Sequence, residues 1–181
     1  MNGQTLPAGP LFPTMTSMKG VSFLMVVSAA WLTLIVSGCE EKIPSDAREA
    51  LLSAEDFVYF SVDPNRLDNI LPDEALHGWK ILGKASIEDK GTRTKLIGAL
   101  RKGIEANDGK VAACFNPRHA IRVTHDGKTY DFVICFECFS ISYYIDGARQ
   151  KGILVTDSPR TVFNETLKEL GLPLAGELVK D

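Results

Sequence analysis

The spacing of hydrophobic positions changes along the chain, and this change separates predicted strands from predicted helices. Residues 57–62 are aromatic and β-branched and are followed by Asp63-Pro64-Asn65, which is typical of a strand that ends in a turn. Residues 79–87 form a second apolar run and predict another strand, and the short apolar run 111–115 predicts a buried one.

Two segments instead repeat their apolar residues at helical spacing. The first predicts a helix over residues 92–106, followed by a turn at Asn107-Asp108-Gly109, and its apolar positions are Leu96, Ile97, Leu100 and Ile104. The second predicts a helix that begins at Ser158 as N-cap with Pro159 in its first turn, and that ends at Gly171. Its apolar face consists of Phe163, Leu167 and Leu170.

Two Asp-Gly pairs, Asp126-Gly127 and Asp146-Gly147, lie between β-branched runs and predict two-residue hairpin turns. A turn at 126–127 places His119 opposite Ile134 and Arg118 opposite Cys135 on the partner strand. The stretch 128–145 is too long for one ordinary strand, so we expect the chain to change direction near Glu137-Cys138. The sequence therefore predicts an α+β fold: an antiparallel β-meander sheet with about two helices packed on one face.

The N-terminal forty residues have a different character. Residues 1–17 carry no charge, and Lys19 precedes a sixteen-residue apolar run, Val21 to Val36. One positive charge before such a run is how an export signal begins, and the run is shorter than most membrane-spanning helices. It ends in Val36-Ser37-Gly38-Cys39, which resembles the lipobox of bacterial lipoproteins: a branched apolar residue, two small residues and the cysteine that is lipidated.

This resemblance implies a signal peptide over 1–38, lipidation of Cys39 and attachment of the mature protein to a membrane through acyl chains. Met18, or alternatively Met15, is then the expected start of translation. Residues 39–50 are expected to be the lipidated N-terminus and a polar tether, and 51–181 a single α+β domain. By resemblance to enterobacterial sorting rules, Glu40 after the cysteine favours the outer membrane, with the domain facing the periplasm. The alternatives are an uncleaved N-terminal membrane helix and a secretory signal that is cut elsewhere.

Composition narrows the class of partner. The chain has 181 residues and a net charge of −3, and every one of its 23 acidic residues follows position 38. Nucleic-acid binding needs a concentrated basic surface, and the sequence contains no basic stripe. We therefore expect no nucleic-acid partner. The lipobox resemblance implies a membrane as one partner, through lipidated Cys39, and a protein of the envelope as the other.

Three cysteines of the domain lie close to a histidine in two short segments. Cys114 and His119 belong to Cys-Phe-Asn-Pro-Arg-His, while Cys135 and Cys138 belong to Ile-Cys-Phe-Glu-Cys. Thiolates with an imidazole suit tetrahedral zinc, so a zinc site is one hypothesis. A disulfide of Cys114 with Cys138 or Cys135 that leaves one buried thiol is a second, and three buried thiols that pack as small apolar side chains are a third. Thiol–disulfide exchange at Cys135-x-x-Cys138 is a fourth, which the β-rich flanks disfavour.

Other polar residues support ordinary structural roles. Arg118 and Glu137 are expected to form a polar pair across the hairpin, and His77 and His125 are interpreted as a loop residue and a hairpin-end residue. Nucleophile-elbow, phosphate-loop and dinucleotide motifs are absent from the sequence. No residue is therefore assigned a catalytic role.

The cysteine segments are similar to uncharacterised domains of bacterial envelope proteins, to which no activity is attached. The leading hypothesis is a non-enzymatic, lipid-anchored envelope protein whose domain binds another macromolecule or has a structural role. The alternative is a metal-dependent or thiol-based enzyme that uses Cys114, His119, Cys135 and Cys138. A module that binds a small ligand is a second alternative.

Overall fold

The computed structural model describes residues 42–66 and 71–176. The predicted signal peptide, the lipobox, the start at Met18 and the lipidated Cys39 lie outside these residues. No helix of the described part combines the length and the apolar character that a membrane crossing requires.

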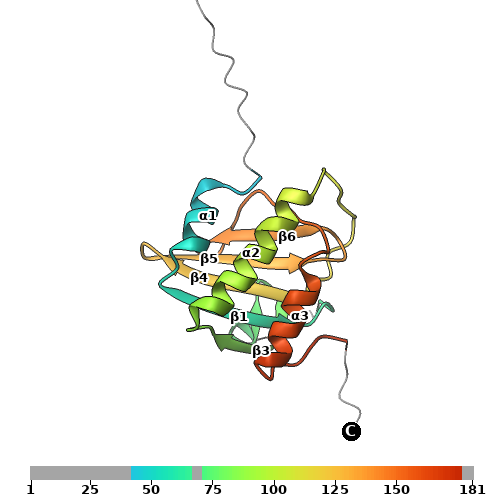
Figure 1. Ribbon diagram of the computed structural model, residues 1–181. Coiled ribbons are helices and arrows are strands. Elements are labelled where there is room, and N and C mark those ends of the chain that lie inside the picture. The colour runs from blue at the N-terminus through green and yellow to red at the C-terminus, as the bar shows by residue number, and fades with distance from the viewer. Residues whose placement is uncertain (1–41, 67–70, 177–181) are drawn as a thin grey trace, which may run out of the picture. The chain divides into compact units, whose positions relative to one another are not determined.

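The described chain forms three α-helices, one short 3-10 helix and eight strands, an α+β fold with an antiparallel sheet as predicted (Figure 1). The elements in chain order are α1 (Ser45–Leu52), β1 (Asp56–Val62), η1 (Pro72–Glu74), β2 (Ala75–Leu76), β3 (Trp79–Ser86), α2 (Lys90–Ala106), β4 (His119–His125), β5 (Lys128–Cys135), β6 (Ser140–Ile145), β7 (Ala148–Arg149), β8 (Ile153–Leu154) and α3 (Arg160–Glu169).

The strands are ordered β2-β3-β1-β4-β5-β6-β7, and β8 pairs with β6. From β4 to β7, neighbours in the sheet are also neighbours in sequence, so this half is the predicted meander. The other half is not sequential, because β1 lies between β3 and β4 and pairs antiparallel with both. The connection from β3 to β4 is α2, which crosses the sheet in Figure 1.

Both predicted hairpins are confirmed in position, and the first has the predicted pairing of His119, although Arg118 precedes β4 and does not pair with Cys135. Asp126 and Gly127 have φ values of 48° and 70°, the left-handed pair that a type I′ turn requires, and His119 pairs with Ile134 as expected. Asp146 and Gly147 form the second such turn, between β6 and β7. The expected change of direction is a third turn, over residues 136–139, after which Ser140 pairs with Cys135.

All three helices pack on one face of the sheet (Figure 1). Leu96, Leu100 and Ile104 of α2 and Phe163 and Leu167 of α3 are buried against the sheet residues of that face. Asp89 caps α2, because its Oδ2 accepts from the backbone nitrogen of Thr92 at 2.7 Å, and this hydrogen bond lowers the pKa of the Asp89 carboxyl. The helix therefore begins two residues before the predicted start.

Three local expectations were wrong. Residues 45–50, expected to be part of a tether, belong to α1, whose Ala47 and Ala50 are fully buried because small residues let the helix lie close to the sheet. Residues 111–115 are not a strand but an irregular loop in which Val111 is 58% exposed. Ser158 does not cap the last helix; its hydroxyl is hydrogen-bonded to Thr156, and α3 begins at Arg160.

No α-helix of the described residues packs on the opposite face of the sheet, which we call the helix-free face. It has a small apolar cluster, whose buried members are Phe60, Val62, Leu76, Trp79, Ala120 and Val133. Side chains alternate between the two faces along each strand, so polar residues next to this cluster are held on the same open surface.

Candidate functional site

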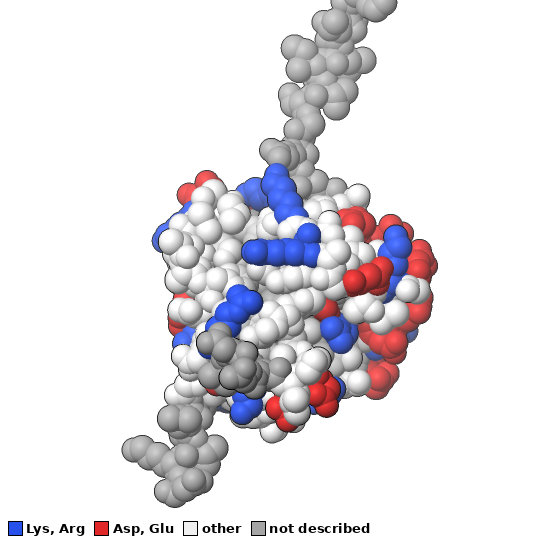
Figure 2. All heavy atoms as spheres, turned by 180° about the vertical axis from the view of Figure 1, so that it is seen from behind, with Lys and Arg blue, Asp and Glu red and all other residues white. Residues whose placement is uncertain are grey.

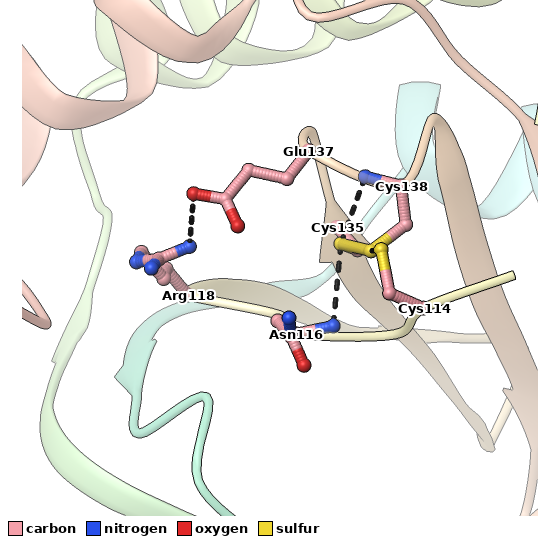
Figure 3. The surroundings of a disulfide bond; sticks show 6 residues. All are labelled: Cys114, Asn116, Arg118, Cys135, Glu137 and Cys138. Atoms are coloured by element: carbon pink, nitrogen blue, oxygen red, sulfur yellow. Dashed lines mark hydrogen bonds and ion pairs between the residues drawn. A yellow bond between two sulfur atoms is a disulfide. The ribbon is translucent and has the colours of Figure 1, made fainter. Parts of the chain in front are cut away.

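The three cysteines come together where the loop before β4 meets the turn between β5 and β6 (Figure 3). Cys135 and Cys138 form a disulfide, and Cys114 is a free, exposed thiol whose Sγ lies 2.6 Å from Sγ of Cys138. The disulfide differs from both pairings expected from sequence, because the turn at 136–139 brings together two cysteines that a regular strand would separate onto opposite faces. Cys135 and Cys138 are fully buried.

The sulfur of Cys135 accepts two backbone hydrogen bonds. The nitrogen of Cys138 lies 3.1 Å from it and the nitrogen of Asn116 lies 3.4 Å from it (Figure 3). The loop that carries Cys114 is also tied to the turn, because the nitrogen of Ala112 donates to the carbonyl of Cys138 at 3.1 Å. The expected pair of Arg118 and Glu137 is present beside the disulfide, with an Nη1 to Oε1 distance of 2.7 Å.

His119 does not join the sulfurs. It is 2% exposed, and its ring lies among Tyr59, Phe136 and Phe163. The Tyr59 hydroxyl donates its one hydrogen to the carbonyl of Phe163, so its oxygen accepts from Nδ1 of His119 at 2.9 Å. Burial, assisted by the charges of Arg118 and Arg160 and opposed by a hydrogen bond with Asn164, lowers the pKa of His119 to about 3. His119 is therefore a neutral core histidine.

This arrangement changes the zinc hypothesis. Three sulfurs without the imidazole leave a tetrahedral ion short of one protein ligand, and the disulfide removes two thiolates. Among the described residues, the group that brings three potential ligand atoms within 4.8 Å is Glu55, His125 and Asp126, at the far end of the β4–β5 hairpin, and it has two exposed members. Exposed acidic groups of this kind are common in proteins without a metal, so their proximity does not indicate a metal site.

A second candidate site lies on the helix-free face and was not predicted. The strand registers place four polar side chains in one row across β4, β5, β6 and β7, where Arg122 pairs with Asp131, Asp131 with Tyr144 and Tyr144 with Arg149. The adjacent row contains Ala120, Val133 and Ser142, and the small side chain of Ser142 lines a cavity beside the polar row.

Asp131 is the centre of this row. It is 2% exposed, and its two oxygens accept from Nε and Nη2 of Arg122 at 2.7 and 2.8 Å. His77, from the turn between β2 and β3, donates to it through Nε2 at 2.7 Å. Burial raises the pKa of Asp131, but these hydrogen bonds and the nearby positive charge outweigh burial, so the pKa is lowered overall. The carboxylate is ionised and holds the two basic side chains in place.

His77 links the row to the edge strands. Its backbone has a φ of 52°, in the left-handed region, and its ring stacks on Tyr144 with centroids 3.5 Å apart and planes 6° apart. Such a conformation is uncommon for a residue other than glycine, and here it points the imidazole over the sheet. The interpretation of His77 as a simple loop residue was therefore incomplete.

A cavity of about 420 Å³ opens beside this row. It is lined by Arg66, His77, Trp79, Phe115, Ser142, Tyr144 and Arg149. The guanidinium carbon of Arg66 lies 5.7 Å from the centre of the Trp79 ring, and the Phe115 and Trp79 rings are 5.8 Å apart. The cavity thus has aromatic walls and two guanidinium groups, and we call it the sheet-face pocket.

The charges around the sheet-face pocket are unevenly distributed. In Figure 2, which shows the molecule from behind, basic side chains stand across the middle of the surface, whereas acidic side chains gather along the right-hand edge. Arg122 is neutralised by Asp131, but neither Arg66 nor Arg149 forms an ion pair with another residue of the described part. Among the described residues, the lining of the pocket therefore has an excess of positive charge.

The pairing of some residues in this site could have been predicted from the sequence. The register that pairs His119 with Ile134 also pairs Arg122 with Asp131, and a two-residue turn at 146–147 pairs Tyr144 with Arg149. Arg66 and His77 had no such signal, because they reach the pocket through the turn-rich segment between β1 and β3.

No protein-family model, curated protein or solved structure matches this chain, so the interpretation of both sites depends on their own geometry.

Proposed function

We propose that this protein is a lipid-anchored module of the bacterial cell envelope that binds a small anionic ligand in the sheet-face pocket. The anchor is supported by the lipobox-like sequence Val36 to Cys39 and by the apolar run before it. On this proposal the acyl chains of Cys39 hold the domain at a membrane, facing the periplasm from the outer membrane. The domain binds its ligand without chemically changing it.

The observation that carries the binding function is the pairing of aromatic walls with positive charge. Trp79, Phe115 and Tyr144 offer ring faces and edges, and Arg66 and Arg149 offer guanidinium donors, around a volume within the usual range of ligand pockets. Guanidinium groups bind carboxylates and phosphates through paired hydrogen bonds. The ligand class is therefore a small molecule with a carboxylate or phosphate group on an apolar or aromatic body.

Asp131 contributes to this site by fixing it rather than by meeting the ligand. Its two oxygens are occupied by Arg122 and His77. His77 in turn supports the ring of Tyr144, which lines the pocket. A pocket whose polar side chains are already hydrogen-bonded loses less side-chain entropy on binding.

Trp79 allows a direct binding measurement. The chain has two tryptophans, and the other, Trp31, lies within the predicted signal peptide, so Trp79 alone reports in the processed protein. Phenyl phosphate is a suitable probe, with benzyl alcohol as its uncharged counterpart. We expect saturable quenching of Trp79 fluorescence by phenyl phosphate at micromolar to about millimolar concentration, and much weaker quenching by benzyl alcohol.

Arg149→Gln tests the role of charge in this binding. We expect it to weaken phenyl phosphate binding by about ten-fold, equivalent to about 1.4 kcal/mol. Arg101→Gln, on α2 at the opposite face, is the matched control and should leave the affinity unchanged. Equal affinity in Arg149→Gln and wild type, or no saturation up to about 10 mM, would contradict the pocket as an anion site.

The anchor is tested separately. In a bacterium that expresses the full chain and is fed an alkyne analogue of palmitate, wild-type protein should be labelled and should sediment with membranes. Cys39→Ser should lose the label, and Cys114→Ser is a control that should retain it. Labelling that survives in Cys39→Ser would rule out lipidation at this residue without bearing on the pocket.

A further inference from the structure

We propose that Cys114 is the exposed thiol through which the buried Cys135–Cys138 disulfide exchanges with thiols and disulfides outside the protein. This inference is independent of the ligand in the sheet-face pocket. It assigns a second, covalent chemistry to the three-cysteine site, with low-molecular-weight thiols and disulfides of the glutathione class as reactants.

The accessibility of the three sulfurs differs sharply. Cys135 and Cys138 are fully buried, so an outside thiol cannot reach their bond directly. Cys114 is exposed, and its sulfur touches that of Cys138 at 2.6 Å. Figure 3 shows the three side chains converging from two segments of the chain. Cys114 is therefore the one sulfur of the three that contacts both solvent and the disulfide.

The internal step conserves atoms and electrons. The thiolate of Cys114 attacks Sγ of Cys138, the Cys114–Cys138 bond forms, and the Cys135–Cys138 bond breaks. Cys135 leaves as a thiolate and takes up the proton that Cys114 gave up. No oxidant or reductant is consumed, because one disulfide replaces another.

The surroundings of Cys135 favour its departure. A leaving thiolate is stabilised by hydrogen-bond donors, and the backbone nitrogens of Cys138 and Asn116 already lie 3.1 and 3.4 Å from the Cys135 sulfur. Cys138 does not leave, because its sulfur is bonded to Cys135 before the exchange and to Cys114 after it. Cys138 is thus the pivot, and Cys135 is the leaving group.

The loop of Cys114 can accommodate the new bond. Residues 110–118 belong to no helix or strand, yet the hydrogen bond from Ala112 to the carbonyl of Cys138 holds the loop against the turn. Once Cys114 is disulfide-bonded, an outside thiol attacks its exposed sulfur and releases the thiolate of Cys138. A second outside thiol then resolves the mixed disulfide, which leaves three protein thiols and one oxidised small molecule.

The rate of reduction tests this route. Full-length protein in detergent is incubated with reduced glutathione, quenched by alkylation and analysed by peptide mass mapping, which separates Cys39 from the other cysteines. We expect Cys114→Ser to slow the reduction of the Cys135–Cys138 disulfide by at least ten-fold. Ala113→Ser, which changes the neighbouring exposed residue and retains all three thiols, should reduce at the wild-type rate.

A second variant gives a test that does not depend on a reduction rate. Cys135→Ser removes the leaving group, and in oxidised glutathione we expect its peptide map to contain a Cys114–Cys138 disulfide. Equal reduction rates in Cys114→Ser and wild type would overturn the proposal, as would two unlinked thiols in Cys135→Ser that retains the wild-type circular dichroism spectrum. One zinc ion per chain in place of any disulfide in the wild-type protein would overturn it as well.

Discussion

The two faces of the sheet differ in what they bury. In the described part of the chain, the helix-covered face has 22 buried residues in one apolar cluster, whereas the helix-free face has six, next to a buried carboxylate. On the covered face the buried His119 is held neutral among aromatic rings. On the open face Asp131 is held ionised by two basic partners. Packing therefore stabilises the fold mainly from one side, and polar chemistry is concentrated on the other.

This division is the basis of four predictions. Substitutions on the helix-covered face should change the free energy of unfolding and leave the sheet-face pocket intact. Substitutions on the helix-free face should either alter the pocket with little change in the free energy of unfolding, or change that free energy through the loss of a charge.

Phe163→Ala should have the largest effect. Phe163 is fully buried, with its ring centroid 5.1 Å from that of Phe136 and 5.7 Å from that of Tyr59, so truncation leaves a cavity. We expect a loss of about 3–5 kcal/mol in the free energy of unfolding, measured by urea denaturation. Phe115→Ala, on the open face, removes the same side chain where it is only partly buried and should cost less than half as much. Equal losses would remove the distinction between the faces.

Asp131→Asn should have an intermediate effect that depends on pH. Asn cannot pair with the charge of Arg122, and we expect a loss of about 1–3 kcal/mol at neutral pH. The folded pKa of Asp131 lies below its ordinary value of 3.8, so the carboxylate's contribution is complete above that value and is lost as pH falls through the folded pKa. The stabilities of variant and wild type, measured by denaturation from pH 7 to pH 2, should therefore converge in acid.

Protonation of His119 should lower the free energy of unfolding in a different pH range from that of Asp131. Its folded pKa of about 3 is below the ordinary 6.5, so the unfolded chain binds a proton first and stability should begin to fall below pH 6.5. This earlier loss should persist in Asp131→Asn. An Asp131→Asn variant without any loss between pH 6.5 and pH 4 would contradict the assignment of that window to the covered face.

Two glycines of α2 give the most closely matched comparison. A Cβ on Gly103 would lie 2.5 Å from Cγ of Pro159, so Gly103→Ala should cost about 1–3 kcal/mol through overpacking. A Cβ on Gly98 meets nothing within 4 Å, so Gly98→Ala should stabilise the protein by about 0.5–1 kcal/mol through helix propensity. Thermal melts of the two variants should shift in opposite directions. Shifts of the same sign would show that α2 is not closely packed at its crossing with α3.

The features predicted correctly from sequence are those that depend on local interactions. The helical spacing of Leu96, Leu100 and Ile104 and the Asp-Gly turns act over a few residues, so α2 and both hairpins were found. The wrong expectations concern segments whose structure depends on contacts with distant parts of the chain. Residues 111–115 are as apolar as a strand, but they pair with no strand of the described sheet and form a loop that is hydrogen-bonded to the turn at 136–139 through Ala112 and Cys138.

The candidate sites were only partly predictable for the same reason. The proximity of Cys114, Cys135 and Cys138 followed from the hairpin, but which two are bonded depends on the geometry of the turn at 136–139. The sheet-face pocket draws its side chains from five segments of the chain, and a sequence pattern identifies a site well only when its residues share one segment. His119 shows the reverse error, because its neighbours in sequence suggested a ligand and its neighbours in space make it part of the core.

The insertion of β1 between β3 and β4 also has a consequence for synthesis of the chain. One edge of β1 can pair with β3 soon after it is made, but its other partner, β4, begins at His119, about 60 residues after β1 ends. At about 5–20 residues per second, translation leaves that edge open for several seconds. An open apolar edge is prone to pair with other chains, so aggregation during biogenesis should be most sensitive to residues 56–62.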